Sequence, residues 1–324
     1  MIKTYLYNHD EHLMYHDVDL FEKDELLENP NNLLWIDMYN CTEYELNYIG
    51  ELFDFHPLAM EDCLQKSPRA KVDEYDDYHF FVLHAIRYDE DASEDEISSI
   101  ELDVFLGSNY IVTIHTVPLN SVGTVARVCR ENVDFMEHGA EHLLYNLIDK
   151  IVDELFPILE SIGDRIDEVE DNIFVYHGTE VTEEILALKQ TLILIRKVLI
   201  PQRNIFSNIR GRYSFFIQDE NVPYFLDLAD HLNSLLDMVN TYRDLINSAF
   251  EIYHSVISER TSDIITILTV ISIIMMPFTV ITGFFGMNVP IPGQNNPLMI
   301  LGITLGMLVL AVWMIVYFKH RKWI

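Results

Sequence analysis

The chain lacks acidic side chains entirely after Asp263, although it is strongly acidic as a whole. Its 324 residues include 52 Asp and Glu residues against 21 Lys and Arg residues, which gives a formal net charge of −31. A domain this acidic is repelled by nucleic acid, whose recognition depends on Lys and Arg neutralising phosphates. We therefore exclude nucleic acid as a partner and expect the acidic part to attract cations, divalent ones above all.

Cysteine is scarce as well. Cys41, Cys63 and Cys129 are odd in number, and they lack the paired spacing of zinc ligands. We expect these residues to be reduced thiols in a cytosolic compartment, because disulfides persist mainly in oxidising compartments.

Two segments near the C-terminus lack charged residues over a length that suits a membrane. Ile264–Phe285 has 22 residues and Leu298–Phe318 has 21. About 20 apolar residues, at roughly 1.5 Å each, cross the ~30 Å hydrocarbon core of a bilayer. Two buried core helices are the alternative, which the length and adjacency of the segments disfavour. We expect two transmembrane helices joined by a short outer loop, residues 286–297.

Basic residues return directly after the second segment, at Lys319, Arg321 and Lys322. The positive-inside rule places this tail in the cytoplasm, and an even number of spans returns the N-terminal domain to the same side. We expect a multi-pass protein of the cell membrane (plasma or inner membrane) with both termini cytoplasmic. A proton relay is not expected, because neither span contains a charged residue.

The soluble part lacks any linker rich in Gly or Ser. We expect an α+β domain over residues 1–140 and a helical extension over residues 141–222. Apolar β-forming residues predict three strands, at His79–Ile86, Ile100–Leu106 and Tyr110–His115. Helical patterns occupy Thr42–Phe53, Leu58–Leu64, Leu143–Phe174 and Thr182–Arg212, the last interrupted at Pro201.

A long stretch from Pro223 onward lacks residues that break helices. No glycine follows until Gly283, and the next proline is Pro277. Apolar residues recur there at alternating spacings of three and four, which is a heptad pattern. They are Phe225, Leu228, Leu232, Leu235, Val239, Tyr242, Ile246, Ala249, Tyr253 and Val256. We expect one helix over residues 223–285, on the order of 90 Å long, that ends in the first span.

A second stripe on the same helix is rich in hydroxyl groups. It consists of Ser255, Ser258, Ser262, Ile265, Thr269, Ser272, Met276, Thr279 and Gly283. Two spans cannot enclose an aqueous path, so transport requires several copies around an axis. This stripe predicts a pore lining, in which the Ile and Met side chains form a constriction that can gate by dewetting. Helix packing in lipid is the alternative, since small residues serve that purpose too.

The first span ends in Phe284-Phe285-Gly286-Met287-Asn288. With Met276-Pro277-Phe278-Thr279 upstream, a second span downstream and a basic tail, this resembles the CorA family of magnesium channels, which a Gly-Met-Asn signature marks. Three further stretches resemble the family, namely His56–Asp62, Leu143–Asp149 and Val222–Phe225. The resemblance covers the chain from about residue 50 to the end.

The resemblance implies a funnel-shaped homopentamer whose first span lines the pore. Gly286, Met287 and Asn288 would form a selectivity ring, whose uncharged oxygens hydrogen-bond the water shell that Mg²⁺ sheds reluctantly. Thr279 and Met276 match pore positions below that ring. Ile265 and Leu268 match the apolar gate, and Glu251 matches an acid near the inner pore. Ser262 stands where family members frequently have Asn.

The resemblance also implies that acids at subunit interfaces sense intracellular Mg²⁺. The matching positions are Glu61, Asp62, Asp149 and Asp227. Bound cations would neutralise these carboxylates and favour a closed state. Mg²⁺ is then both cargo and regulator, with Co²⁺ and Ni²⁺ as further cargo and no organic cofactor. The alternative for each acid is an exposed side chain or a helix cap.

A zinc-transporting branch of the same superfamily is the main competing interpretation. Its signature usually differs at the middle position, so the intact Gly-Met-Asn favours magnesium or cobalt. The outer loop lacks the acid that family members often carry there, which leaves the ion preference open. His9, His12 and His16 have some zinc-binding character, although they are more typical of surface histidines.

Two other classes are an enzyme and a non-conducting membrane scaffold. The residues His138–His142 spell H-x-x-E-H, a zinc-peptidase pattern that requires both histidines on one face of an established helix. Gly139 lies within the pattern at the expected start of a helix, so we do not expect an enzyme. The hydroxyl stripe disfavours a scaffold.

Overall fold

The computed structural model describes residues 1–88, 97–174, 179–209, 211, 217–287, 297–321 and 323. The chain divides into two compact units. The first unit comprises Met1–Asn172 and Gly178–Ser248, and the second comprises Ile173–His177 and Ala249–Ile324.

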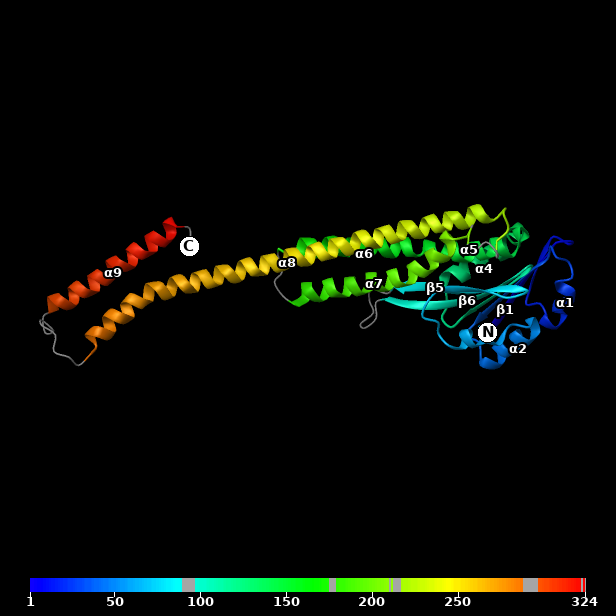
Figure 1. Ribbon diagram of the computed structural model, residues 1–324, viewed down its shortest axis with the longest axis horizontal. Coiled ribbons are helices and arrows are strands. Elements are labelled where there is room, and N and C mark those ends of the chain that lie inside the picture. The colour runs from blue at the N-terminus through cyan, green and yellow to red at the C-terminus, as the bar shows by residue number, and fades with distance from the viewer. Residues whose placement is uncertain are drawn as a thin grey trace. The chain divides into compact units, whose positions relative to one another are not determined.

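A seven-stranded sheet forms the centre of the first unit, with strand order β2-β1-β3-β7-β6-β5-β4 (Figure 1). The strands are β1 Ile2–Asn8, β2 Leu13–His16, β3 Leu33–Tyr39, β4 Lys71–Glu74, β5 Tyr78–Tyr88, β6 Ile97–Gly107 and β7 Tyr110–His115. β3 and β7 pair in parallel, and the other neighbouring strands pair antiparallel. The three predicted strands are present as β5, β6 and β7.

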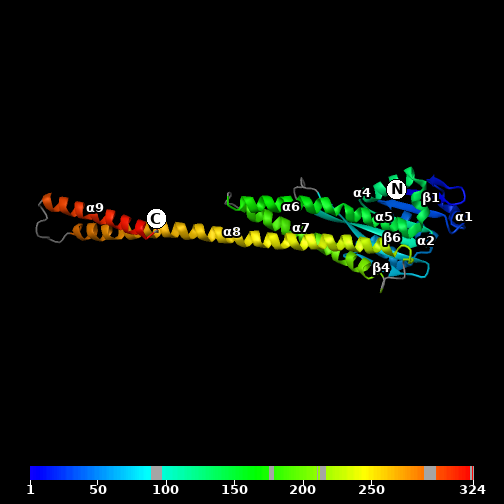
Figure 2. The same cartoon turned by 90° about the horizontal axis from the view of Figure 1, so that it is seen from above.

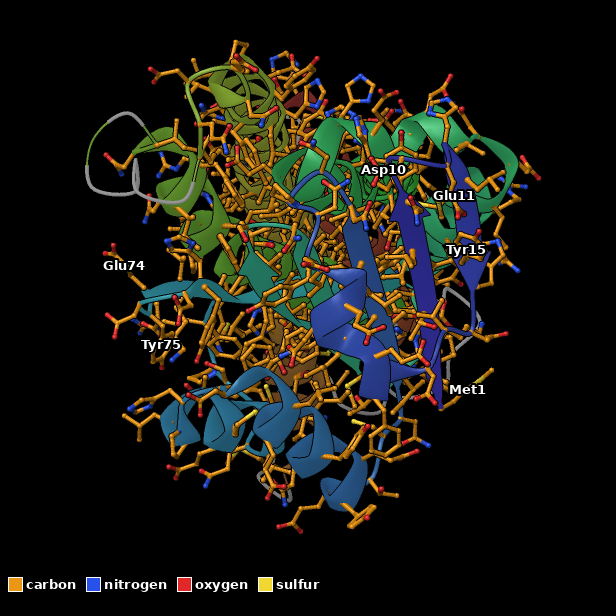
Figure 3. The ribbon with its side chains drawn as sticks, turned by 90° about the vertical axis from the view of Figure 1, so that its right-hand side faces the viewer. Met1, Asp10, Glu11, Tyr15, Glu74 and Tyr75 are labelled. Carbon is orange, nitrogen blue, oxygen red and sulfur yellow. The ribbon has the colours of Figure 1, made fainter. Side chains whose placement is uncertain are left out.

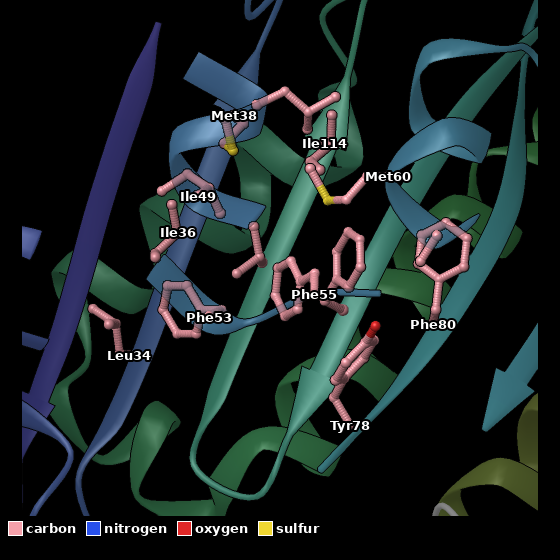
Figure 4. Packing of buried hydrophobic residues seen from close by; sticks show 14 of the residues in the cluster. Leu34, Ile36, Met38, Ile49, Phe53, Phe55, Met60, Tyr78, Phe80 and Ile114 are labelled. Atoms are coloured by element: carbon pink, nitrogen blue, oxygen red, sulfur yellow. The ribbon is translucent and has the colours of Figure 1, made fainter. Parts of the chain in front are cut away.

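Short helices lie against one face of the sheet. They are η1 Leu20–Glu22, α1 Lys23–Leu26, α2 Glu43–Phe53 and α3 Pro57–Leu64. A cluster of buried apolar side chains from α2, α3 and the strands fills this interface, and Phe55 stacks on Phe105 at its centre, with ring centroids 3.9 Å apart (Figure 4). Because side chains alternate along a strand, the opposite face of each strand is free to pack elsewhere.

Local sequence explains why α2 and α3 begin where they do. The Thr42 side chain accepts from the Glu45 amide while the Glu45 carboxylate accepts from the Thr42 amide, which is a capping box. α3 begins with Pro57, whose fixed φ suits a first helical position, after a cap by His56. This start sets the direction in which Glu61 and Asp62 project from α3.

The other face carries the longer helices, namely α4 Asn120–Glu131, η2 Val133–His138, α5 Gly139–Asp153, α6 Leu155–Asn172 and α7 Thr179–Ser207. Figure 2 shows α5, α6 and α7 in a second view. The helical run predicted from Leu143 to Phe174 is divided between α5 and α6 at Glu154. The predicted interruption at Pro201 is wrong, because α7 continues through it. Leu199, Gln202 and Ile205 are buried around this proline, so packing outweighs the missing backbone hydrogen bond.

α8 spans Val222–Phe285 as one helix of 64 residues, and α9 spans Pro297–His320. Most of the predicted heptad stripe is buried, with Phe225, Leu228, Leu232 and Leu235 fully enclosed in the first unit. Both helices are long and apolar enough to cross a membrane, and almost none of their apolar windows is buried. The expected α+β domain, long helix and apolar C-terminal helices are therefore present.

Candidate functional site

The part of α8 in the second unit has two different faces. Val270 is buried, and Thr266, Ile274, Pro277 and Ile281 are partly covered. The opposite face is bare, and it includes all of the predicted pore-lining residues, which are exposed. They are Glu251, Ser255, Ser258, Ser262, Ile265, Leu268, Thr269, Ser272, Met276, Thr279 and Gly283. Apolar residues outside the stripe, such as Ile264, Ile267 and Val280, are exposed as well, so the hydroxyl content and not the exposure distinguishes the stripe.

The hydroxyl groups of this stripe have a defined orientation. Thr269 donates to the Ile265 carbonyl at 2.7 Å, Ser272 to that of Leu268 at 2.8 Å, and Thr279 to that of Met275 at 3.0 Å. Each O–H is used within the helix, so the lone pairs of each oxygen remain to accept. A hydrated cation presents water O–H groups, and a wall of acceptors can hydrogen-bond to them.

Only part of the predicted selectivity ring lies within the described residues. α8 ends at Phe285, and the Gly286 amide donates to the Thr282 carbonyl at 2.8 Å. A Cβ on Gly286 would lie 3.0 Å from that carbonyl oxygen, so a side chain there would be crowded. Met287 is exposed. Asn288 lies outside the described residues.

The basic tail follows α9. Lys319 is the penultimate residue of that helix, and the Arg321 guanidinium lies over the Tyr317 ring at 5.9 Å. Lys322 lies outside the described residues. The two described cations thus lie at one end of an apolar helix, where the positive-inside rule expects them.

Two of the four predicted regulatory acids come together in the first unit, around His231. Asp149 Oδ1 lies 3.6 Å from His231 Nδ1, and Asp227 Oδ2 lies 3.8 Å from His231 Nε2. Asp153 completes the group, since Asp149, Asp153 and His231 offer ligand atoms that lie within 4.8 Å of one another. Carboxylate and imidazole donors in this arrangement are suited to a divalent cation.

The charge balance of this cluster is unfavourable to an empty site. The Asp149 side chain is only 14% exposed, and its Oδ1 atom is buried without a hydrogen bond from the described residues. Burial and the neighbouring Asp153 raise the pKa of Asp149, against the opposing effect of Lys150 and His231. Lys150 supplies one positive charge, 2.6 Å from Asp153. A bound cation would relieve the repulsion that remains.

Glu61 and Asp62 do not join this cluster. Glu61 is exposed and accepts from Gln65, whereas Asp62 pairs with Lys71 at 2.6 Å. Sequence reasoning missed Asp153 and His231, although each lies one helical turn after a predicted ligand, Asp149 and Asp227 respectively. That i, i+4 spacing was the available signal.

In the H-x-x-E-H pattern the rings of His138 and His142 lie 4.9 Å apart, but Glu141, which would serve as the base of a peptidase, is held by other residues. Gly139 has a φ of 85° and separates His138, in η2, from the rest of α5. Glu141 accepts from the Gln218 amide at 2.9 Å and from the Asn221 side chain at 2.8 Å. A second group of possible metal ligands consists of the exposed side chains of His12, Asp134 and Glu137, in which His12 Nε2 lies 3.1 Å from Asp134 Oδ1. β1 and β2 bring His12 there, so the N-terminal histidines lie on a folded part of the sheet.

Residues 30–320 match the family described as "CorA-like Mg2+ transporter protein". The chain belongs to this family. It is a divalent metal ion transporter of the CorA-like family and a membrane protein with two C-terminal spanning helices, and its family is not one of enzymes.

Several relatives of this CorA-like chain match over most of their length. It is 30% identical to the putative metal ion transporter YfjQ of Bacillus subtilis, over 92% of both chains. It is 33% identical to the cobalt/magnesium transport protein CorA of Thermotoga maritima, over 85% of this chain and 79% of the relative. The solved structure of the CorA magnesium transporter from Methanocaldococcus jannaschii has the same fold, with a TM-score of 0.86 and 24% identity. That match covers 100% of this chain and 99% of the other.

Proposed function

We propose that this CorA-like chain forms a homopentameric channel for Mg²⁺, with Co²⁺ and Ni²⁺ as further cargo, that closes when intracellular Mg²⁺ rises. The observation that carries the proposal is the bare stripe on α8. A hydroxyl-rich face in a membrane helix is best matched by a protein partner or by water, because lipid offers no donor to the free lone pairs of these oxygens. Five copies around an axis would provide both.

The order of side chains along the stripe supports a gated path. The hydroxyl residues Thr269 and Ser272 lie between the apolar Ile265 and Met276, and Thr279 follows. Leu268 lies beside them. Acceptors can hydrogen-bond a hydrated cation without stripping its water, which conduction requires. The apolar positions would form the constriction that dewets when the pore is narrow. Glu251 would attract cations at the inner end, where acids are otherwise absent from the path.

The outer end of the path is assigned to Gly286, Met287 and Asn288. Their amide and carbonyl oxygens would form an uncharged ring that holds the ion with its water shell. Neutrality matters because a ring of carboxylates would bind a divalent ion too tightly for release. The crowding that a Cβ on Gly286 would meet supports a tight backbone at this point.

Regulation is assigned to the acids of the first unit. Asp149 and Asp227, with Asp153 and His231, would bind Mg²⁺ on one subunit. Glu61 and Asp62, which lie apart from this cluster on α3, would face a neighbouring subunit. Cations bound at such interfaces would remove carboxylate repulsion and stabilise a closed arrangement, so that flux falls as internal Mg²⁺ rises.

We assign the transporter to the cell membrane (plasma or inner), with both termini in the cytoplasm. The proposed division is a cytoplasmic α/β domain (1–140), a helical extension (141–222) and the stalk helix (223–285). An outer loop (286–297), the second span (298–318) and a basic tail (319–324) complete it.

Flux into proteoliposomes with a trapped Mg²⁺ indicator tests the proposal. Asn288→Ala is expected to abolish Mg²⁺ flux. Thr279→Val removes one acceptor per subunit and is expected to lower flux at least about fivefold, the factor that corresponds to one hydrogen bond of ~1 kcal/mol. Thr266→Val is the matched control, since Thr266 makes the same contact, to the Ser262 carbonyl at 2.8 Å, on the covered face.

The outcomes separate the alternatives. Equal losses in Thr279→Val and Thr266→Val would overturn the assignment of the stripe to the pore. Zinc flux without magnesium flux would favour a zinc transporter of the same superfamily. A pentamer that conducts no divalent cation would be a scaffold.

A further inference from the structure

A cavity in the first unit gathers basic side chains on an otherwise acidic chain. It has a volume of about 230 Å³ and is lined by residues of the loop after α3, of β5 and β6, and of α7. Its cations are Lys66, Arg69 and Lys197. The chain as a whole has 52 acidic residues against 21 basic ones, and Figure 3 shows Asp10, Glu11 and Glu74 among them.

The loop that carries Lys66 and Arg69 is fixed by two buried side chains. The Ser67 amide donates to Glu101 Oε2 at 2.7 Å, and the Ser67 carbonyl accepts from His84 Nε2 at 3.0 Å. The His84 and Glu101 side chains are 10% and 13% exposed. Both backbone polar groups of Ser67 are therefore held by buried side chains. The backbone positions of Lys66 and Arg69, which flank Ser67, are consequently fixed.

α7 is held against β5 beside the same cavity, through Gln202. β4 begins at Lys71, opposite Val82, so at His84 the edge of β5 has no strand beside it among the described residues. Gln202 takes that place: its Nε2 donates to the His84 carbonyl at 3.2 Å, and its Oε1 accepts from the His84 amide at 3.4 Å. Gln202 is 1% exposed. This contact positions Lys197, about one turn earlier on α7, at the wall of the cavity.

None of the three cations forms an ion pair among the described residues, although the charge of Lys66 acts on the Glu101 carboxylate. Within the described part of the chain, no carboxylate lies within ion-pair distance of Lys66, Arg69 or Lys197. Glu101 is the only acid among the lining residues, and its Oε2 accepts from the Ser67 amide. Burial raises the pKa of Glu101 overall, against the opposing effects of that hydrogen bond and of the nearby Lys66, which weakens its competition with an anion. Like charges placed together without a partner repel one another, and a bound anion would remove that repulsion.

We propose that this cavity binds a small phosphate-bearing anion of about the size of pyrophosphate. The Arg69 guanidinium can bond two phosphate oxygens at once, and two lysines supply point charges around it. The Ser99 hydroxyl adds a neutral donor, whereas the Ser67 hydroxyl donates to the Arg69 carbonyl at 3.4 Å. Leu194 and Val198 close one side with apolar surface. The volume suits one or two phosphoryl groups better than a whole nucleotide.

The test uses the full-length protein in detergent after removal of divalent cations, so that a bound metal cannot bridge to the anion. Isothermal titration with pyrophosphate is expected to show one saturable site per chain. Arg69→Gln and Lys197→Gln are each expected to raise the Kd about tenfold, the effect of one charge-assisted hydrogen bond. Arg196→Gln is the matched control, because Arg196 is exposed on the same helix and does not line the cavity.

Further arms identify the ligand chemistry. A comparison of inorganic triphosphate with ATP shows whether the ligand is a free phosphate or a nucleotide. Equal affinities would assign recognition to the phosphates alone. Tighter ATP binding would add the nucleoside to the ligand. Citrate of similar charge that binds as well as pyrophosphate would overturn the phosphate assignment. No saturable binding, or equal losses in Arg196→Gln and Lys197→Gln, would overturn the site. These results do not depend on whether the chain conducts Mg²⁺.

Discussion

Gly163 on α6 allows Tyr242 on α8 to approach the helix backbone, and an alanine at this position tests that contact. A Cβ built on Gly163 would lie 2.7 Å from the Tyr242 hydroxyl oxygen and 3.0 Å from its Cζ. Both distances are shorter than ordinary van der Waals contact. The hydroxyl lies in an acidic setting, since burial and then Glu160, Asp167 and Asp164 raise the pKa of Tyr242. The half-buried Tyr242 ring must therefore shift to admit a Cβ on Gly163.

Two opposing effects decide whether Gly163→Ala raises or lowers the free energy of unfolding. Replacing glycine by alanine inside a helix gains about 0.5–1 kcal/mol, because the unfolded chain loses freedom. Overpacking a well-packed contact costs about 1–3 kcal/mol. Gly163→Ala is therefore expected to destabilise the protein by up to about 2 kcal/mol. At Gly123, inside α4, a Cβ would meet nothing within 4 Å. Gly123→Ala is therefore expected to stabilise by the gain alone.

Thermal unfolding of the full-length protein in detergent would show whether Gly163→Ala lowers the melting temperature and Gly123→Ala raises it. Amide hydrogen exchange in Leu155–Asn172 would show whether the loss is local to α6. Adding Tyr242→Phe removes the closest atom and is expected to recover part of the stability lost in Gly163→Ala. A melting temperature that rises equally in Gly163→Ala and Gly123→Ala would refute the argument that α6 and α8 are in tight contact here.

Three further predictions follow from buried groups. Burial lowers the pKa of His115, but Asp37, 3.2 Å from Nε2, and the Val117 carbonyl, 2.7 Å from Nδ1, raise it overall. The stability from this pair is therefore complete below the unfolded pKa of about 6.5 and lost as pH rises through the raised pKa. Melting temperatures from about pH 6 to 9 should fall more steeply for the native protein than for His115→Gln, and parallel curves would contradict this. Phe105→Ala should cost about 3–5 kcal/mol in unfolding experiments, because the ring is fully buried, whereas Phe174→Ala, at an exposed position, should cost little. Asp149→Asn should shift inhibition of flux to several-fold higher internal Mg²⁺, and an equal shift in Asp171→Asn, an exposed acid on α6, would argue against a specific site.

The long helix and the central strands were predictable because their patterns are local. The apolar spacing from Phe225 to Tyr253 fixes one face of a helix, and that face is buried in the structure. Strands β5, β6 and β7 are rich in β-branched and aromatic residues, which mark strands without reference to the rest of the chain. The bare face of α8 was predictable for the same reason, since period alone places Ser272 and Thr279 on one side.

Contacts between distant segments could not be predicted in this way. β3, Leu33–Tyr39, is buried throughout, and such an apolar run does not distinguish a strand from a helix. Its parallel pairing with β7 joins Leu34 to Tyr110, and no local pattern encodes that partner. The cluster around His231 depends on α5 and α8 lying together, so sequence suggested Asp149 and Asp227 only through resemblance. The path of α7 through Pro201 depends on burial by other elements.

α8 is one continuous helix that connects the acid cluster around His231 to the hydroxyl-rich stripe. Asp227 and His231 lie on the same unbroken helix as the hydroxyl stripe, with no glycine between them and Gly283. A twist or tilt applied at its N-terminal end cannot be absorbed by a loop, because none interrupts the helix before Phe285. Pro277 is the one interior position of α8 whose backbone nitrogen lacks a hydrogen to donate, so the helix loses one backbone hydrogen bond there. Pro277 lies on the partly covered face, one residue after Met276 of the stripe that we assign to the pore, so the backbone of α8 is loosened directly beside that stripe.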